Sequence, residues 1–213
     1  DRSGADFLGC VAQIKDRLNA NPVPLQIPIG AENDFIGMID LIDMKANVYT
    51  DALNKGETFE VKDIPSELKE QADRCREKLM EALSDIDEGI MEKYLAGEKV
   101  SKEEVRAAVR KGTLELSITP VLCGAAFKNK GVQQLLDSVV HYLPSPVEIS
   151  AIEGINPNNQ EVVSRKPDAS EPLSALAFKI MTDPFVGQLA FVRVYSGEMK
   201  SGSYVYNSTN NQR

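Results

Sequence analysis

The stretch PVLCGAAFKNKGVQ, residues 120–133, is the part of the sequence that decides the fold. It starts inside a short apolar run, Ile118–Cys123, which predicts a strand. The loop Gly124–Gly131 follows, with the glycine and asparagine residues that loops favour. Apolar residues at helical spacing then predict a helix over 132–143. A strand, a loop and a helix in this order predict an α/β fold.

Downstream of this helix the chain changes character twice. Two prolines end the helix, and the polar residues 147–171 predict a linker with one strand at its start. After Pro172 apolar and polar residues alternate, which predicts strands over 176–181, 189–195 and 204–207, separated by glycine turns. Short consecutive strands of this kind indicate an all-β barrel, of which the sequence holds only the first strands.

Upstream, the longest helical pattern covers residues 66–96, with Pro65 at its start. Its apolar residues recur every three or four positions, and its other face is acidic. Residues 67–93 hold nine acids and five bases. A solvated helix face explains this charge, and a docking face for a basic partner is the alternative.

The other upstream elements are shorter. A helix over 5–18 has its apolar residues on one face. Ser101–Glu104 is a capping box that starts a second short helix, which Gly112 is expected to end. Strands are predicted over residues 25–29, 35–42, 46–49 and 58–61.

Composition limits the classes of function. The 213 residues carry a net charge of −8 with a pI near 4.9, which argues against general nucleic-acid binding because phosphate contacts need lysine and arginine. No apolar run approaches membrane-spanning length, and one or two domains fit the chain. Cys10, Cys75 and Cys123 are odd in number and far apart, so neither disulfides nor a zinc site is predicted, and a reducing cytosol fits best. His141, the one histidine, is interpreted as a packing or surface residue, with a general base as the alternative.

Nucleotide-binding motifs are incomplete in this sequence. The phosphate-binding pattern G-x-x-x-x-G-K-[ST] does not occur. Asp34–Gly37 matches the D-x-x-G pattern of a magnesium and γ-phosphate loop, and we interpret it as a chance match because only two positions are fixed. Asn54–Glu57 and Asn129–Val132 resemble the start of the guanine-reading Asn-Lys-x-Asp motif but lack its aspartate, so both are interpreted as turns. No catalytic residue and no metal ligand is predicted.

Residues 120–133 resemble the last guanine-binding loop of elongation factor G, a bacterial GTPase family, and the helix after that loop. Asp1–Phe7 resembles the end of the family's Asn-Lys-Met-Asp motif, with Asp1 as the guanine-reading carboxylate. Three further parts of the family follow in order: the insert at 28–30 and 34–43, the exit from the nucleotide-binding domain at 143–146, and the start of the second domain at 175–197. This ordered run over essentially the whole chain is more specific than any single motif.

The resemblance implies the fold class and the domains. The fold is α/β: the C-terminal part of a phosphate-loop GTPase domain with an α+β insert, followed by the start of an all-β barrel domain. The implied parts are the end of the nucleotide-binding domain before the insert (1–18), the insert (19–117), the last strand, guanine loop and helix (118–146), a linker (147–171) and the first barrel strands (172–213).

The resemblance also implies a guanine site. Asp1 would accept hydrogen bonds from the edge of the guanine ring. The backbone N–H of Ala126 would bind guanine O6, flanked by Ala125 and Phe127. The family often has serine where this chain has Ala125. Because the O6 contact comes from the backbone, we expect it to survive this difference.

The implied function is that of a ribosomal translocase, which uses GTP hydrolysis to move tRNA and mRNA during elongation. The intact protein would bind GTP or GDP with Mg²⁺ and contact rRNA and the ribosomal stalk protein. Both ends of the sequence look cut, and the phosphate loop would precede Asp1, so the chain is expected to be an inactive, monomeric, cytoplasmic fragment without tightly bound nucleotide or membrane contact. Two alternatives stay open: an acidic protein-interaction module without catalysis, and a related release-factor or ribosomal-protection GTPase.

Overall fold

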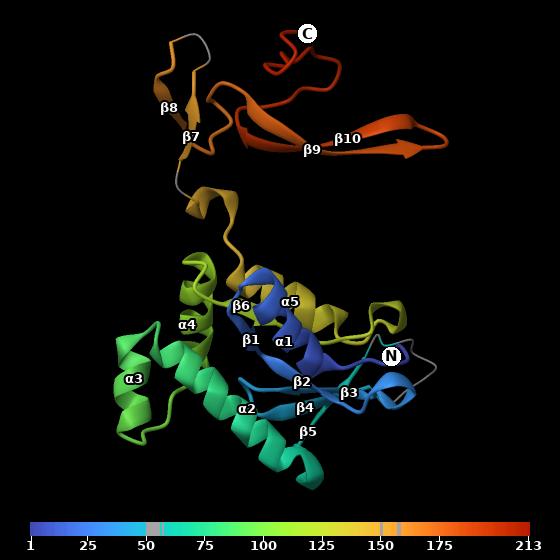
Figure 1. Ribbon diagram of the computed structural model, residues 1–213, viewed down its shortest axis with the longest axis vertical. Helices are drawn as coiled ribbons and strands as arrows, with labels where there is room; N and C mark the ends of the chain where they lie inside the picture. Colours follow the sequence, from blue (N-terminus) through green and yellow to red (C-terminus); the bar gives the residue numbers. More distant parts are fainter. Residues whose placement is uncertain (50–55, 57, 150, 157–158) are drawn as a thin grey trace. The chain divides into compact units, whose positions relative to one another are not determined.

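A computed structural model describes residues 1–49, 56, 58–149, 151–156 and 159–213 (Figure 1). These residues form two compact units, Asp1–Leu143 and Pro144–Arg213. Within the described ranges, no helix combines the length and the apolar character that crossing a lipid bilayer requires.

The first unit mixes helices with two sheets. Strands β1 and β6 form a parallel pair, and β2 to β5 form an antiparallel sheet in chain order. The elements are α1 (Phe7–Leu18), β1 (Pro22–Pro24), β2 (Gln26–Ile29), η1 (Glu32–Asp34), β3 (Gly37–Asp40), β4 (Lys45–Val48), β5 (Glu60–Lys62), α2 (Ser66–Ser84), α3 (Glu88–Leu95), α4 (Lys102–Leu114), β6 (Thr119–Val121), η2 (Ala126–Lys128) and α5 (Val132–Tyr142).

Strand β1 was not predicted, because its two prolines each remove a ladder donor and the segment reads as a break. It nevertheless pairs with β6, and flanking hydrogen bonds extend the pair. The Leu25 N–H donates to the Val121 carbonyl (2.9 Å), and the Thr119 N–H donates to the Asn21 carbonyl (2.7 Å). The pair joins segments almost a hundred residues apart and fixes the strand that leads into the loop 124–131.

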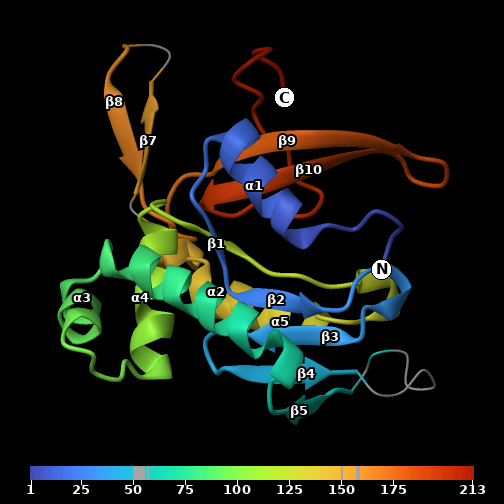
Figure 2. The same cartoon turned by 60° about the horizontal axis from the view of Figure 1, so that its bottom comes forward.

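The two faces of the antiparallel sheet are buried in different surroundings. Ile27 and Ile39 belong to the main core, together with apolar residues of α2 and α4. Figures 1 and 2 show α2 running beside this sheet. Met38, one position before Ile39, belongs instead to a second apolar cluster on the opposite face, as expected for a strand whose side chains alternate. The core residues from α2 and α4 are Ala72, Leu79, Met80, Leu83, Val105, Ala108 and Val109.

The single helix predicted over 66–96 is wrong. The structure ends α2 at Ser84 and starts α3 at Glu88. Asp87 lies in an extended conformation, and its carboxylate accepts the Ile90 N–H (3.2 Å), so it caps a new helix. A continuous apolar spacing hid this break, because the spacing persists through the turn.

The capping box at Ser101 is confirmed, and the end of its helix differs from the prediction. The Glu104 carboxylate accepts the Ser101 N–H (2.9 Å) while the Ser101 hydroxyl accepts the Glu104 N–H (3.3 Å). Helix α4 continues through Gly112 to Leu114. Gly112 is buried against Ile86 and Ile118, so its missing side chain serves close packing rather than termination.

The second unit is built from β-hairpins. Its elements are η3 (Pro146–Glu148), β7 (Ile152–Ile155), β8 (Val162–Arg165), β9 (Ser174–Asp183) and β10 (Gly187–Ser196). The segment predicted as a linker with one strand contains the hairpin β7–β8. The predicted strands on either side of Asp183 are confirmed as the antiparallel pair β9–β10, and the Asp183 carboxylate accepts the N–H groups of Phe185 (2.8 Å) and Val186 (2.9 Å) in the turn between them.

The strand predicted over 204–207 is wrong. That segment forms only an isolated bridge between Asn207 and Gln212, inside a chain of turns. Alternation of Tyr204 and Tyr206 with smaller residues suggested a strand, but no neighbouring strand pairs with it among the described residues. The described strands of this unit pair two by two, so the barrel stays a prediction.

Candidate functional site

The loop between β6 and α5 is closed by backbone hydrogen bonds. The Ala125 N–H donates to the Lys130 carbonyl (2.9 Å), and the Lys130 N–H donates back to the Ala125 carbonyl (3.2 Å). Between them lies the single turn η2, which ends at Asn129 in the left-handed conformation (φ 54°), a conformation that asparagine tolerates. The loop therefore has a defined shape in which residues 126–128 protrude.

One residue of the loop, Ala125, is buried in a small apolar cluster. The cluster contains Met38 of β3 together with Phe35 and Tyr49, which lie next to strands of the antiparallel sheet. The Lys130 ammonium donates to the Phe35 carbonyl (2.8 Å). Burial, and then the nearby charge of Lys128, lower the pKa of the Lys130 ammonium. Lys130 thus has a structural role: it connects the loop to Phe35, which lies just before β3.

The outer side of the loop presents backbone donors. Ala126 and Phe127 open η2, so their N–H groups have no carbonyl in a preceding turn. Among the described residues, neither N–H donates a hydrogen bond. Both residues are exposed, and Phe127 is 97% exposed. These donors can bind an acceptor from outside the chain, and guanine O6 is such an acceptor.

Asp1 lies beside this loop, although it is 124 positions from Ala125 in sequence. Its carboxylate is 3.5 Å from the Lys128 ammonium and its side chain is 24% exposed. The residues after Asp1 are held in place: the Gly4 N–H donates to the Glu32 carboxylate (2.6 Å), and Asp6 caps α1. The structure therefore places the Asp1 carboxylate next to Lys128, in the same turn as the exposed residues Ala126 and Phe127.

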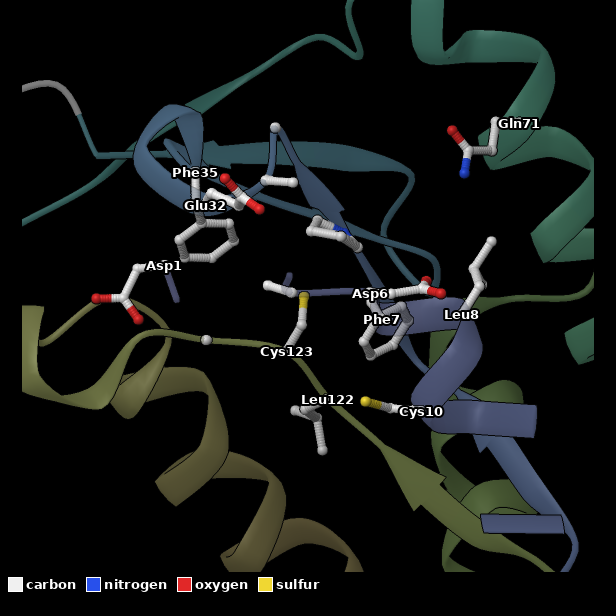
Figure 3. Close-up of a pocket in the computed structure, with 15 residues that line it drawn as sticks. Asp1, Asp6, Phe7, Leu8, Cys10, Glu32, Phe35, Gln71, Leu122 and Cys123 are labelled. Atoms are coloured by element: carbon white, nitrogen blue, oxygen red, sulfur yellow. The ribbon is translucent and has the colours of Figure 1, made fainter. Parts of the chain in front are cut away.

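A hollow of about 470 Å³ lies next to Asp1 and continues toward α1 (Figure 3). Figure 3 shows Asp1 at one end of the hollow, Cys123 in its middle and Gln71 at the other end. Burial raises the pKa of the Cys123 thiol to about 12, so this cysteine is a packing residue and not a nucleophile. The lining is mainly apolar and includes carboxylates, which makes the hollow a poor phosphate site.

The other sequence candidates lie away from this arrangement or have structural roles. Gly37 of the Asp34–Gly37 match starts β3 and pairs with Val48. His141 is exposed on α5, where its carbonyl accepts from Arg110 (2.6 Å). The pattern Asn54–Glu57 lies largely outside the described residues. Within the described ranges, no group of acidic, histidine or cysteine side chains could hold a metal ion.

Sequence reasoning missed two residues of the site. Lys128 is part of the quoted loop, and its proximity to Asp1 depends on the tertiary fold. Tyr49 stands in the sequence only as the end of a predicted strand, yet its side chain is buried under the loop. The sequence offered one signal for Tyr49. It is a tyrosine at the end of a predicted strand, and a buried tyrosine hydroxyl needs a hydrogen-bond partner.

Two comparisons with known proteins bear on this site. Residues 172–213 match the family model for elongation factor G domain 2. Over 94% of the chain the fold matches the crystal structure of a protein from Thermus thermophilus, with 28% sequence identity and a TM-score of 0.64. The chain covers 27% of that protein's chain, so it spans about a quarter of its length. Taken together, the two matches identify the chain as similar to translation elongation factor G, a family of translational GTPases.

Proposed function

We propose that this chain is part of a ribosomal translocase, a GTPase of the cytoplasm that moves tRNA and mRNA through the ribosome, and that it supplies the contacts to the guanine base. The observation that carries the proposal is the meeting of Asp1 with the loop 125–128. The match to the elongation factor G model lies in the other unit and supports the same protein class independently.

The chemistry of the base fits these residues. A carboxylate accepts from both N1–H and the 2-amino group of guanine, and a backbone N–H donates to O6. Adenine has an amino donor in place of O6 and no hydrogen on N1, so it would leave the Ala126 N–H and the Asp1 carboxylate without partners. The arrangement therefore favours guanine over adenine.

The rest of the nucleotide needs residues that this sequence does not contain. Without the phosphate-binding pattern, the described chain offers two base contacts and no cradle for the phosphates or their Mg²⁺. We therefore propose that the chain alone does not hydrolyse GTP and binds GDP weakly, and that the intact protein containing it does both.

Ala126→Pro in the intact protein tests the base contact. Proline removes the N–H and is tolerated at the first position of a helical turn, and Ala125 before it (φ −130°, ψ 84°) lies outside the α-helical region that a following proline disfavours. GDP affinity should fall about tenfold, the value of one typical hydrogen bond. Ala126→Ser keeps the N–H and should bind GDP as the unchanged protein does.

Titration calorimetry measures both variants. Because 6-thio-GDP carries sulfur, a weak acceptor, in place of O6, its affinity should change little in Ala126→Pro. Equal GDP affinity in Ala126→Pro and Ala126→Ser would show that the base does not contact this loop.

A protein-binding role is the second candidate, and the acidic face of α2 favours it. Glu77 and Glu81 are exposed, and no basic side chain within the described ranges pairs with them, whereas Glu70 is paired with Arg74. A basic partner such as the ribosomal stalk protein would suit this face, with rRNA contacts made elsewhere in the intact protein. A translocation assay with the intact protein distinguishes the translocase from release-factor and ribosomal-protection GTPases, which would carry the same base contacts.

A further inference from the structure

We propose that Tyr49 is a positioning residue for guanine recognition: its buried hydroxyl holds the end of the guanine loop and thereby sets the place of the Ala126 N–H. Tyr49 follows directly after strand β4, which is far from the loop in sequence. This inference rests on the proposed guanine-binding function.

The contact is a backbone hydrogen bond to a side chain. The Gly131 N–H donates to the Tyr49 hydroxyl at 2.8 Å, and this bond is buried. The hydroxyl in turn donates to the side-chain amide oxygen Oε1 of Gln134 on α5 (3.0 Å). Tyr49 thus joins the last residue of the loop to the first turn of the helix, using its hydroxyl both as acceptor and as donor.

Gly131 needs this support because of its backbone. Its φ of 83° lies in the left-handed region, and a Cβ there would come within 2.8 Å of the Cys123 carbonyl oxygen and 2.9 Å of the Met38 methyl carbon. The residue is therefore closely packed between Cys123 and Met38 of β3. Among the described residues its N–H donates to the Tyr49 hydroxyl and to no backbone carbonyl.

Neighbouring loop residues connect the position of Gly131 to the position of the Ala126 N–H. Gly131 follows Lys130, which is paired with Ala125 by two backbone hydrogen bonds. Ala125 precedes Ala126 and belongs to the same buried apolar cluster as Tyr49. The tyrosine hydroxyl therefore holds Gly131, and the paired residues Lys130 and Ala125 connect Gly131 to Ala126.

Two further hydrogen bonds hold this part of the chain in place. The Gln133 side-chain amide donates to the Gly56 carbonyl (3.1 Å), and the Lys130 ammonium donates to the Phe35 carbonyl (2.8 Å). One bond holds the start of α5 and the other holds the loop to Phe35, and neither involves the tyrosine hydroxyl. We therefore expect loss of the hydroxyl to shift the loop's donors without unfolding the protein.

The test is Tyr49→Phe in the intact protein, with GDP and 6-thio-GDP as probes. Phenylalanine keeps the buried ring and removes only the hydroxyl, leaving the Gly131 N–H without its acceptor. GDP affinity should fall about tenfold, as expected for one misplaced hydrogen bond to the base. Affinity for 6-thio-GDP should stay nearly unchanged, because sulfur gains little from the Ala126 N–H.

The control is Tyr206→Phe, which removes an exposed tyrosine hydroxyl that contacts Asn211 (2.7 Å) in the other unit. It should leave both affinities unchanged. Hydrogen exchange of the peptide spanning 124–131 should accelerate in Tyr49→Phe and not in Tyr206→Phe.

The outcomes separate this inference from the proposed function. If the unchanged protein prefers GDP over 6-thio-GDP and Tyr49→Phe keeps that preference, the positioning role is overturned and guanine binding stands. An equal loss of both affinities also overturns it, because it shows a general structural defect. If the unchanged protein binds no GDP, the proposed function fails and the positioning role fails with it.

Discussion

Asp1→Asn is expected to shift the base preference of the intact protein from guanine to xanthine. The carboxylate of Asp1 can accept from guanine N1–H and from the 2-amino group, and asparagine can accept only one of these while its amide nitrogen faces the other donor. GDP affinity should fall on the order of 100-fold, the value of two hydrogen bonds to a charged group. Xanthine carries a carbonyl where guanine carries the 2-amino group, so xanthosine diphosphate should gain affinity.

Competition titration of GDP against xanthosine diphosphate measures this shift. Asp6→Asn is the matched control, because Asp6 lies in the same stretch and caps α1, a role that asparagine fills equally well. It should leave the preference for guanine unchanged. A loss of both nucleotides in Asp1→Asn would show that Asp1 supports the fold rather than the base.

Gly37→Ala is expected to have the largest effect on stability. A Cβ at this position would overlap the carbonyl oxygen of Asn47 and lie 3.1 Å from the Val48 Cα, so β3 and β4 would have to separate. Backbone atoms cannot move aside as a flexible side chain can. The free energy of unfolding should fall by about 3 kcal/mol or more, at the upper end of what overpacking costs.

Gly154→Ala is the control for this change. Gly154 also lies in a strand, and a Cβ there would meet nothing within 4 Å. Urea denaturation of both variants should show a lower midpoint for Gly37→Ala alone. The comparison also tests the interpretation of Asp34–Gly37: equal stability combined with lost nucleotide binding in Gly37→Ala would mean that the D-x-x-G match is functional after all.

Local sequence patterns predicted those helices and strands that depend on neighbouring residues in the sequence. The capping box at Ser101 involves four adjacent residues, and the alternation along β9 and β10 repeats within each strand. Both are present in the structure because no contact with a distant part of the chain overrides the local pattern. Helix α1 follows its apolar spacing in the same way.

Elements that depend on distant partners were missed or misjudged. Strand β1 exists because β6 lies beside it, and prolines conceal it from any local rule. The break between α2 and α3 depends on one capping aspartate, Asp87, within an otherwise regular apolar spacing. The segment 204–207 has the alternation of a strand and no described partner to pair with.

The candidate site divides in the same way. The roles of Asp1 and Ala126 came from resemblance to a family, and the structure adds that the Asp1 carboxylate lies 3.5 Å from the ammonium of Lys128, which belongs to the same short turn as Ala126. The contact between Tyr49 and Gly131 spans 82 positions and could not be inferred from spacing. The contact exists only because the fold brings the segment after β4 next to the loop.

The most direct test of guanine recognition is a crystal structure of the intact protein with GDP bound. The account predicts the guanine O6 within hydrogen-bond distance of the Ala126 N–H, and the N1 and 2-amino hydrogens facing the Asp1 carboxylate. A guanine base bound elsewhere, with Asp1 and Ala126 free of contact, would contradict it.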